Sequence, residues 1–493
     1  MDKFIKDRFV PFHGKLVLAA ALVYAITAWN SSGYHSADEH FQIIAFAQAK
    51  LGELPVEHLP WEFEAGIRSS LQPWVAVAVF KLAAVLGITD PFNRTLLLRL
   101  LTAVLALFAI RVFVQATIKD VPPELHRAYL LLSYFLWFLP FLYVRFGSEG
   151  WSAIFLMFGL GQVSGERRNT LGLLWAGAAF GIAVLCRPPV GLIVLSALAW
   201  MVIARRAEWR NTTLLVVGSA AMAALGFLLD SAFHGRPHFS TLEYLSMGFG
   251  GDPDVRFDTL PWYYYPPWIV KYAIPPIGIA LLVCFIIVLW KRPKDLFVWC
   301  ILPFIAVHSF IPHKELRFLY PLAPLAPITL ILGLAELRLL VGHIKTGGIA
   351  KFLVVSLVLS NIMGTAVVMT SAAGVGRTVL AQALFHDRPA EGDTIAYVID
   401  PERAWRISLP DFYLPEGMRD TAFLPSADAW VTKDIRYLVA HDKDLGTLFS
   451  NTDRSVVHLA STEAPWVAEL MHWYTWGEGQ APWSLYRIGP TSR

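Results

Sequence analysis

Long apolar runs separated by short polar segments make up most of the chain as far as Ser371. Twelve of these runs approach the roughly 20 residues that a helix needs to cross the apolar core of a bilayer. The runs cover residues 15–30, 73–88, 96–116, 128–144, 148–163, 170–186, 188–204, 213–229, 268–290, 296–311, 319–338 and 349–371. The pattern therefore predicts an all-α polytopic membrane protein.

The pattern changes after Ser371. Short apolar stretches at residues 394–399, 437–440 and 456–460 lie among charged and Pro/Gly-rich turns, which is typical of strands in a soluble domain. We therefore expect a transmembrane catalytic domain over residues 1–374 and a small soluble α/β domain over residues 375–493.

Composition supports the membrane class. The 493 residues are 56% hydrophobic and only 16% charged, and the mean hydropathy is +0.51. A net charge of +3 is too small to indicate a nucleic-acid partner. Cys186, Cys284 and Cys300 all fall inside apolar runs without a paired spacing, so we interpret them as core residues rather than as disulfides or metal ligands.

Basic clusters predict the orientation in the membrane. Lys and Arg gather at the N-terminus and around Arg205, Lys291 and Arg338, which the positive-inside rule assigns to the cytoplasm. The long loops 31–72 and 230–267 then lie outside. Counting crossings from the two ends of the chain gives results that differ by one, so we predict 11–13 transmembrane helices, with the first loop and residues 313–317 both on the non-cytoplasmic face.

The first external loop contains a candidate catalytic acid. Ser36 and Glu39 have the spacing of a capping box, which predicts a helix from Ala37 to about Leu51. Asp38 then lies at the positive end of this helix, where its carboxylate stays ionised and can accept a proton from a hydroxyl group. The alternative is that both acids only stabilise the helix N-terminus.

A second cluster in the same loop combines Trp61, Glu62 and Arg68. An acid, an aromatic ring and an arginine beside Asp38 favour a pocket for a carbohydrate or a phosphate. Each residue also has a simpler explanation, because Trp61 suits the membrane interface and Glu64 with Arg68 has the spacing of a helical ion pair.

Further candidates lie at the ends of later runs. Arg145 and Glu149 flank the start of one run and are candidate substrate contacts, and Arg187 precedes two prolines. Snorkelling also explains an isolated arginine at the end of a span. Tyr264 belongs to the aromatic segment 261–268, whose rings either form an interface belt or stack on a sugar or an isoprenoid chain.

The segment from His313 to Phe318 places charge between two apolar runs, where charge is costly unless it has a function. Arg317 offers a planar fork for phosphate oxygens, Lys314 a mobile positive charge, and His313 a hydrogen-bond donor. A cationic membrane anchor is the alternative. Prolines at positions 321, 324 and 327 predict that the following span begins as a kinked or broken helix.

Three of these motifs resemble those of glycosyltransferase family 22, the lipid-linked mannosyltransferases of GPI-anchor and N-glycan precursor assembly. The residues from His313 to Pro321 look like the hallmark of this family, and Asp38–Gln42 resembles its acidic first-loop motif. Residues 61–63 and 66–69 are most similar to the members that add the third mannose of the GPI anchor. The resemblance covers about residues 15–340.

The resemblance implies a GT-C fold and a polyprenyl-phosphate mannose donor, with a glycolipid or glycan acceptor and inversion at the sugar. It implies that Asp38 is the general base and that Glu39 orients it or shares the task. The implied donor-phosphate ligands are His313, Lys314, Arg317 and Arg68, and the implied substrate contacts are His40, Gln42, Trp61, Glu62, Arg145, Glu149 and Tyr264.

No cofactor or metal is expected, and we interpret the Asp252–Asp254 spacing as part of a loop. The membrane would be that of the endoplasmic reticulum or a bacterial plasma membrane. Other classes stay open: a GT-C enzyme for another sugar, a non-catalytic scaffold, or a carrier of a lipid-linked sugar, although a carrier is expected to have repeated halves and no repeat is visible.

Overall fold

The computed structural model describes residues 3–165, 170–250, 259–341, 347–374, 376–399, 407, 410–415, 418, 421–424, 435–441, 454–474 and 482–489. The chain divides into two compact units. The helical unit comprises Met1–Ala28, Ala37–Leu82 and Leu98–Ala366, and the sheet unit comprises Trp29–Ser36, Ala83–Leu97 and Val367–Arg493.

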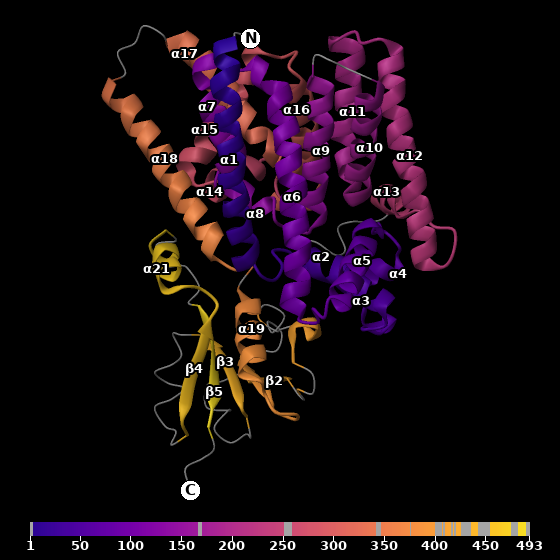
Figure 1. Ribbon diagram of the computed structural model, residues 1–493, viewed down its shortest axis with the longest axis vertical. Coiled ribbons are helices and arrows are strands. Elements are labelled where there is room, and N and C mark those ends of the chain that lie inside the picture. The colour runs from indigo at the N-terminus through magenta and orange to yellow at the C-terminus, as the bar shows by residue number, and fades with distance from the viewer. Residues whose placement is uncertain are drawn as a thin grey trace. The chain divides into compact units, whose positions relative to one another are not determined.

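Helices make up most of the described residues up to residue 370 (Figure 1). The first half contains α1 (Lys3–Asn30), α2 (Ala37–Glu39), α3 (Ala45–Leu51), α4 (Trp61–Glu64), α5 (Leu71–Val85), α6 (Pro91–Thr117), α7 (His126–Phe135), α8 (Phe138–Leu142), α9 (Ser148–Ser164), α10 (Thr170–Cys186) and α11 (Gly191–Ala199). The second half contains α12 (Trp209–His234), α13 (Ser240–Gly250), α14 (Tyr265–Tyr272), α15 (Pro275–Lys291), α16 (Leu296–Phe310), α17 (Ala326–Val341) and α18 (Gly347–Thr370).

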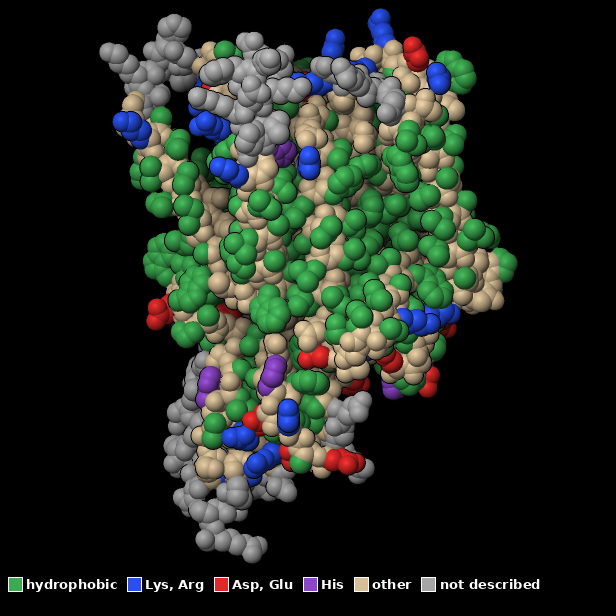
Figure 2. All heavy atoms as spheres, in the orientation of Figure 1, with side chains coloured by type: hydrophobic (Ala, Val, Ile, Leu, Met, Phe, Trp, Pro, Cys, Tyr) green, Lys and Arg blue, Asp and Glu red, His purple; other side chains and the backbone are tan. Residues whose placement is uncertain are grey.

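Hydrophobic side chains cover the middle of the helical unit, as expected for a protein that meets lipid (Figure 2). Among the described residues, five helices are long and apolar enough to cross a membrane, and the pair α15 and α16, bent by 119°, would make a sixth. This number is lower than the 11–13 spans predicted from sequence, because several of the predicted windows form shorter or interrupted helices.

The interruptions have local causes. Window 128–144 divides into α7 and α8, and window 188–204 contains a 3₁₀ turn, α11 and a π-helical turn. Window 268–290 is broken at Ile274, which has a φ of +64°, immediately before the two prolines that open α15. A proline supplies no backbone N–H and disfavours helical geometry in the residue before it, so a continuous helix cannot pass through this point.

The prolines after Arg317 have the predicted effect. Residues Leu316–Leu325 form a 3₁₀ helix, labelled η8, and the α-helix α17 begins only at Ala326. A 3₁₀ helix has three residues per turn, so Arg317 and Tyr320 lie on the same side of it. The proline spacing therefore determines which side chains accompany Arg317.

The sheet unit contains a five-stranded sheet with the order β2-β1-β3-β5-β4. Its elements are α19 (Arg377–Asp387), β1 (Ile395–Val398), β2 (Thr421–Leu424), β3 (Tyr437–His441), β4 (Val456–Ser461), α21 (Pro465–Tyr474) and β5 (Trp483–Ile488). Strand β1 is parallel to β2 and β3, and β5 is antiparallel to β3 and β4. The parallel and antiparallel parts meet at β3.

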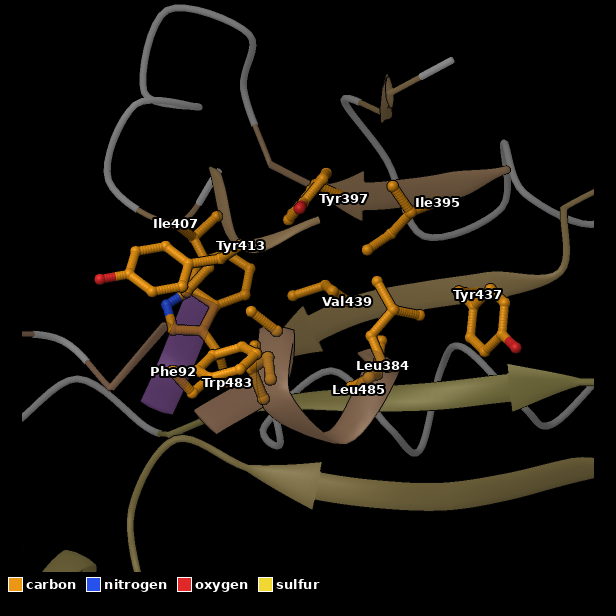
Figure 3. Close-up of a cluster of buried hydrophobic side chains, with 12 residues drawn as sticks. Phe92, Leu384, Ile395, Tyr397, Ile407, Tyr413, Tyr437, Val439, Trp483 and Leu485 are labelled. Atoms are coloured by element: carbon orange, nitrogen blue, oxygen red, sulfur yellow. The ribbon is translucent and has the colours of Figure 1, made fainter. Parts of the chain in front are cut away.

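The core of the sheet unit is aromatic and aliphatic. Leu384 of α19 packs with Tyr397, Val439 and Leu485 from three strands, and Phe92 from the segment Ala83–Leu97 joins the same cluster (Figure 3). The three strands predicted from sequence are confirmed as β1, β3 and β4. Strands β2 and β5 and helices α19 and α21 were not predicted. Residues 29–36 and 83–97, which the sequence led us to expect in the transmembrane domain, group with the sheet unit.

Candidate active site

The first loop opens with a helical segment from Ala37 to Leu51, as predicted. It consists of α2, a π-helical turn at His40–Ile44, and α3, and it ends at Gly52, whose φ of +76° suits glycine. A π-turn inside an α-helix often marks a functional site. Here it directly follows Asp38 and Glu39, so the two acids lie at the free N-terminal end of the segment.

Asp38 meets Arg317 across 279 residues of sequence. The Nη1 atom of Arg317 donates a hydrogen bond to Oδ2 of Asp38 at 2.7 Å. Arg68 approaches the same oxygen, with its Nη2 atom 3.9 Å away. The predicted meeting of the early acid with the later cationic segment is therefore present in the structure.

Arg317 faces three carboxylates. Its Nε and Nη2 atoms donate to the two oxygens of Glu315 at 2.6 and 2.9 Å, which is the bidentate geometry of a strong arginine–carboxylate pair. Its Nη1 atom also lies 3.6 Å from Glu149. His313 also approaches Glu315, with its Nε2 atom 3.2 Å from Oε1.

The pairing affects the ionisation of Glu315. Burial opposes its charged form, but the hydrogen bond and the charge of Arg317, together with His313, outweigh burial and lower the pKa of Glu315 below its usual range. The carboxylate therefore stays ionised at pH values at which an ordinary glutamate begins to take up a proton. The Arg317–Glu315 pair is accordingly a fixed part of the site near neutral pH.

A second buried pair joins the first loop to the start of α9. Arg145 donates to Oε2 of Glu39 through Nε at 3.0 Å and through Nη2 at 2.5 Å, and both residues are buried. The capping-box interpretation directed Glu39 back toward its own helix, whereas the structure pairs it with Arg145. Gly147 lies beside this pair, and a Cβ atom at that position would lie 2.9 Å from Cγ of Glu39.

Lys314 does not take part in this cluster. It is only 3% exposed, and its ammonium group donates to the backbone carbonyls of Leu260, Ile311 and Pro312 at 2.6, 2.6 and 3.4 Å. An ammonium group has three donors, so all three are engaged. Burial also lowers the pKa of Lys314. This geometry does not support the predicted contact with a phosphate, and it makes Lys314 a link between two loop segments.

We expect Lys314→Met to reduce stability without changing the charged cluster directly. The substitution removes the donor from three carbonyls, and an unsatisfied buried polar group costs about 1–3 kcal/mol. Thermal unfolding of the detergent-purified protein would measure the change. The exposed Lys291, replaced by Met in the same way, is the control and should cost under about 0.5 kcal/mol. Equal melting temperatures for the two variants would contradict the assigned role.

The other predicted contacts are distributed around the first loop. Gln42 donates to Glu62 at 2.9 Å, which ties the helical segment to α4. His40 is buried with its ring against Phe41. Trp61 is exposed. None of these contacts reaches the arginines directly, so their predicted role as substrate contacts remains a proposal.

Tyr264 begins an aromatic ladder. Its ring lies 5.2 Å from that of Trp268, and Trp268 stacks on Tyr272 at 5.2 Å. Burial raises the pKa of Tyr264, and the neighbouring Tyr272 and the charge of Glu315 raise it further. The ladder therefore starts within electrostatic range of the charged cluster and continues along α14.

Two residues with a direct place in the cluster, Arg187 and Tyr265, were noted in the sequence but were not assigned to the site. Arg187 is buried, donates to Oε1 of Glu149 at 2.8 Å and lies over the ring of Phe318. Tyr265 is fully buried near Arg187 and Glu315. Snorkelling explained Arg187 well from sequence, and the only available signal was its position just before two prolines, where the chain turns.

Three buried donors beside the cluster have no acceptor among the described residues. They are Nε of Arg68, Nε of Arg187 and the hydroxyl of Tyr265. Leaving such a group unsatisfied costs about 1–3 kcal/mol, so buried donors of this kind normally meet a ligand or water. A guanidinium edge with an open N–H suits an anion such as a phosphate.

The charges of the cluster balance. The arginines are Arg68, Arg145, Arg187 and Arg317, and the carboxylates are Asp38, Glu39, Glu149 and Glu315. Within the described residues, no group of three or more His, Cys, Asp or Glu side chains has the geometry of a metal site. Asp252 and Asp254 lie outside the described residues.

Comparison with known proteins gives a consistent picture. The profile of the Alg9-like mannosyltransferase family matches residues 16–392, which extends the resemblance beyond the predicted end at residue 340. The chain is 28% identical over 357 residues to GPI mannosyltransferase 3 of Yarrowia lipolytica, covering 71% of the chain and 66% of that protein. It is 24% identical over 309 residues to mannosyltransferase APTG1 of Arabidopsis thaliana, covering 60% of the chain and 54% of that protein.

A shorter match has a higher identity. Over 132 residues the chain is 40% identical to alpha-1,2-mannosyltransferase ALG9 of Saccharomyces cerevisiae, covering 26% of the chain and 22% of that protein. The chain thus spans about two thirds or less of the length of the curated relatives it matches.

Among solved structures, the chain resembles ArnT from Cupriavidus metallidurans bound to undecaprenyl phosphate. The TM-score is 0.52 at 13% identity, with 96% of this chain and 97% of that chain covered. At this identity the likeness shows the fold alone. The predicted GT-C fold is confirmed.

Proposed function

Because the chain belongs to the Alg9-like mannosyltransferase family, we propose that it transfers mannose from a polyprenyl-phosphate mannose donor to a lipid-linked or glycolipid acceptor, with inversion at C1 of the sugar. The observation that carries the proposal is the contact between Asp38 and Arg317. It brings a possible proton acceptor and a phosphate-binding fork into one site, as transfer from a sugar phosphate requires.

Asp38 is the proposed general base. Its side chain is partly exposed, whereas Glu39 is buried against Arg145 by two hydrogen bonds. The acceptor hydroxyl oxygen attacks C1 of the mannosyl group, the bond from C1 to the phosphate oxygen breaks, and the hydroxyl proton passes to Asp38. The polyprenyl phosphate leaves with the bonding electron pair.

Arginine side chains stabilise the charge that grows on the leaving phosphate. Arg317 offers the hydrogen bond that it now gives to Asp38, and Arg187 and Tyr265 offer donors that meet no acceptor within the described residues. When Arg317 turns to the phosphate, it releases the Asp38 carboxylate to accept a proton. The Arg187 and Tyr265 donors are already in place, so they can act on the transition state without a large reorganisation.

The length of α12 and the residues at its two ends support an active site on the non-cytoplasmic face. Helix α12 has 26 residues and is therefore about 39 Å long, more than the roughly 30 Å of the apolar core of a bilayer. Arg205 and Arg206 precede its start, whereas Asp230 near its end accepts hydrogen bonds from the backbone and the hydroxyl of Ser70 in the first loop. The positive-inside rule assigns the arginine end to the cytoplasm.

The aromatic ladder supports a lipid-linked donor. Tyr264, Trp268 and Tyr272 extend from the neighbourhood of Glu315 along α14. Aromatic rings with one polar atom suit a position between a charged group and an apolar chain. We infer that the first isoprene units of the donor lie on this ladder.

Membranes with and without the chain, supplied with radiolabelled polyprenyl-phosphate mannose, test the proposal. We expect a new labelled lipid only when the chain is present. Label that crosses the bilayer without forming a new glycosidic bond would instead indicate a carrier. If label is transferred only from a donor that carries another hexose, the proposed reaction type stands and the proposed sugar is wrong.

We expect Gly147→Ala to reduce transfer by about 10- to 100-fold, because the added methyl group would displace Glu39 and its partner Arg145 next to Asp38. Initial rates with purified protein measure the effect. Gly165→Ala is the control, because a Cβ atom there would meet its nearest neighbour at an ordinary 3.5 Å. Equal rates for both variants would show that the close approach at Gly147 has no functional weight.

A further inference from the structure

A cavity of about 350 Å³ lies where the end of α3 meets the end of α12. It uses none of the residues of the charged cluster. We propose that this cavity is a carbohydrate subsite that holds a distal sugar ring of the acceptor while Asp38 acts on the reacting hydroxyl. The inference rests on the proposed function and specifies the acceptor as a glycan of several residues.

The walls of the cavity are aromatic. Phe46 and Phe233 are buried, and Phe63 lies against both, with ring centroids 5.1 Å from Phe46 and 6.3 Å from Phe233. The ring of His234 lies 5.3 Å from Phe63. Flat apolar rings suit the C–H face of a pyranose, and the volume is at the small end of the range for ligand pockets, as one ring requires.

The polar groups of the cavity have mixed character. Glu64 and Arg236 line the cavity and are exposed, so the Glu64 carboxylate can accept hydrogen bonds and the Arg236 guanidinium group can donate them. The Nε2 atom of His234 is buried without a hydrogen-bond partner among the described residues. Sugar hydroxyls both donate and accept, so they can satisfy an acid, a guanidinium group and an imidazole at the same time.

The charged groups beside the cavity are of both signs. The ammonium group of Lys50 already donates to the carbonyl of Phe233 at 2.6 Å and lies 4.9 Å from the centre of the Phe233 ring. Two helices, α3 and α12, end beside the cavity, and helix C-termini carry partial negative charge. The charged side chains of the cavity are Glu64, Lys50 and Arg236, so the cavity offers both a carboxylate and cations to a polar ligand. A sugar with several hydroxyl groups can use both kinds of group, whereas a phosphate would be repelled by Glu64.

The cavity and Asp38 lie at opposite ends of one rigid element. The helical segment from Ala37 to Leu51 has no break, so Phe46 is about 12 Å and Lys50 about 18 Å along its axis from Asp38. Glu62, whose carboxylate accepts from Gln42, precedes Phe63 and Glu64 on α4 and holds that turn against the same segment. The helical segment thus fixes the distance between Asp38 and the cavity, and with it the distance between the reacting hydroxyl and the distal sugar ring of the acceptor.

Binding of linear mannotriose to the full chain in lipid nanodiscs tests the inference, by titration calorimetry and saturation-transfer NMR. We expect Phe63→Leu and Glu64→Gln each to weaken binding at least fivefold, because they remove the aromatic face and the carboxylate without a large change of volume. Phe41→Leu and Glu57→Gln are matched controls outside the cavity and should leave binding unchanged.

Three outcomes decide the matter. If neither Phe63→Leu nor Glu64→Gln changes the affinity for mannotriose, the proposed subsite is wrong, even if mannose transfer is observed. Glycerol 3-phosphate that binds in a Phe63-dependent way while mannotriose does not would make the cavity a lipid-headgroup site and also overturn it. Phe63-dependent mannotriose binding without any transfer would leave the subsite standing and remove the proposed function.

Discussion

Replacing Asp38 with asparagine is expected to reduce mannose transfer by roughly 10²- to 10⁴-fold, the usual contribution of a general base. Asparagine keeps the shape of the side chain and can still lie beside Arg317, but it does not accept a proton at neutral pH. Single-turnover rates with purified protein and saturating donor would isolate this step. Because Asp38 acts on the acceptor, donor affinity should change little.

The comparison with Glu39 sharpens this expectation. Glu39→Gln weakens the buried pair with Arg145, so its main effect should be on stability and on the position of Asp38. A larger loss of the single-turnover rate for Glu39→Gln than for Asp38→Asn, with both proteins folded, would transfer the role of base to Glu39. Full activity of Asp38→Asn would end the general-base assignment.

Arg317→Ala is expected to reduce transfer by about 10²- to 10³-fold, the effect of removing one donor that stabilises transition-state charge. The substitution also removes the shared partner of Asp38, Glu149 and Glu315. Three neighbouring carboxylates would then repel one another, so donor affinity should fall as well as the rate. Initial rates over a range of donor concentrations separate the two effects.

Arg317→Lys keeps the positive charge, so it serves as a control for the possibility that Arg317→Ala simply fails to fold. A lysine cannot form the bidentate pair with Glu315, so its rate should lie between those of the native protein and Arg317→Ala. The exposed Arg210, replaced by alanine, is the control for loss of one positive charge. Native donor affinity in a folded Arg317→Ala variant would rule out the phosphate role.

Local sequence chemistry predicted several elements directly. The strands β1, β3 and β4 follow from short β-branched and aromatic runs between turns. The 3₁₀ helix after Arg317 follows from prolines three residues apart. The bends and breaks inside the apolar windows were not predicted in full, because hydropathy measures how apolar a window is and does not reveal where a helix bends or ends inside it.

Some residues of the candidate site could be predicted from the sequence and others could not. The chemistry of Asp38 and Arg317 was visible in sequence, because charged residues beside apolar runs need a function or a partner. The role of Lys314 was not visible, because an ammonium group can donate either to a phosphate or to backbone carbonyls and the sequence does not show which one is near. The cavity at Phe63 was invisible too, since its walls come from α3, α4 and α12, which are distant in the sequence.

The sequence by itself determined that this chain is a helical membrane protein with a small α/β part, and that an acid and an arginine could serve one site. Only the tertiary structure decided that Arg145 pairs with Glu39, that Arg187 pairs with Glu149, and that Lys314 faces carbonyls. The physical reason is that hydropathy and helix-breaking act between near neighbours, whereas a buried charge pairs with whichever opposite charge or polar backbone group the packed helices bring within about 3 Å.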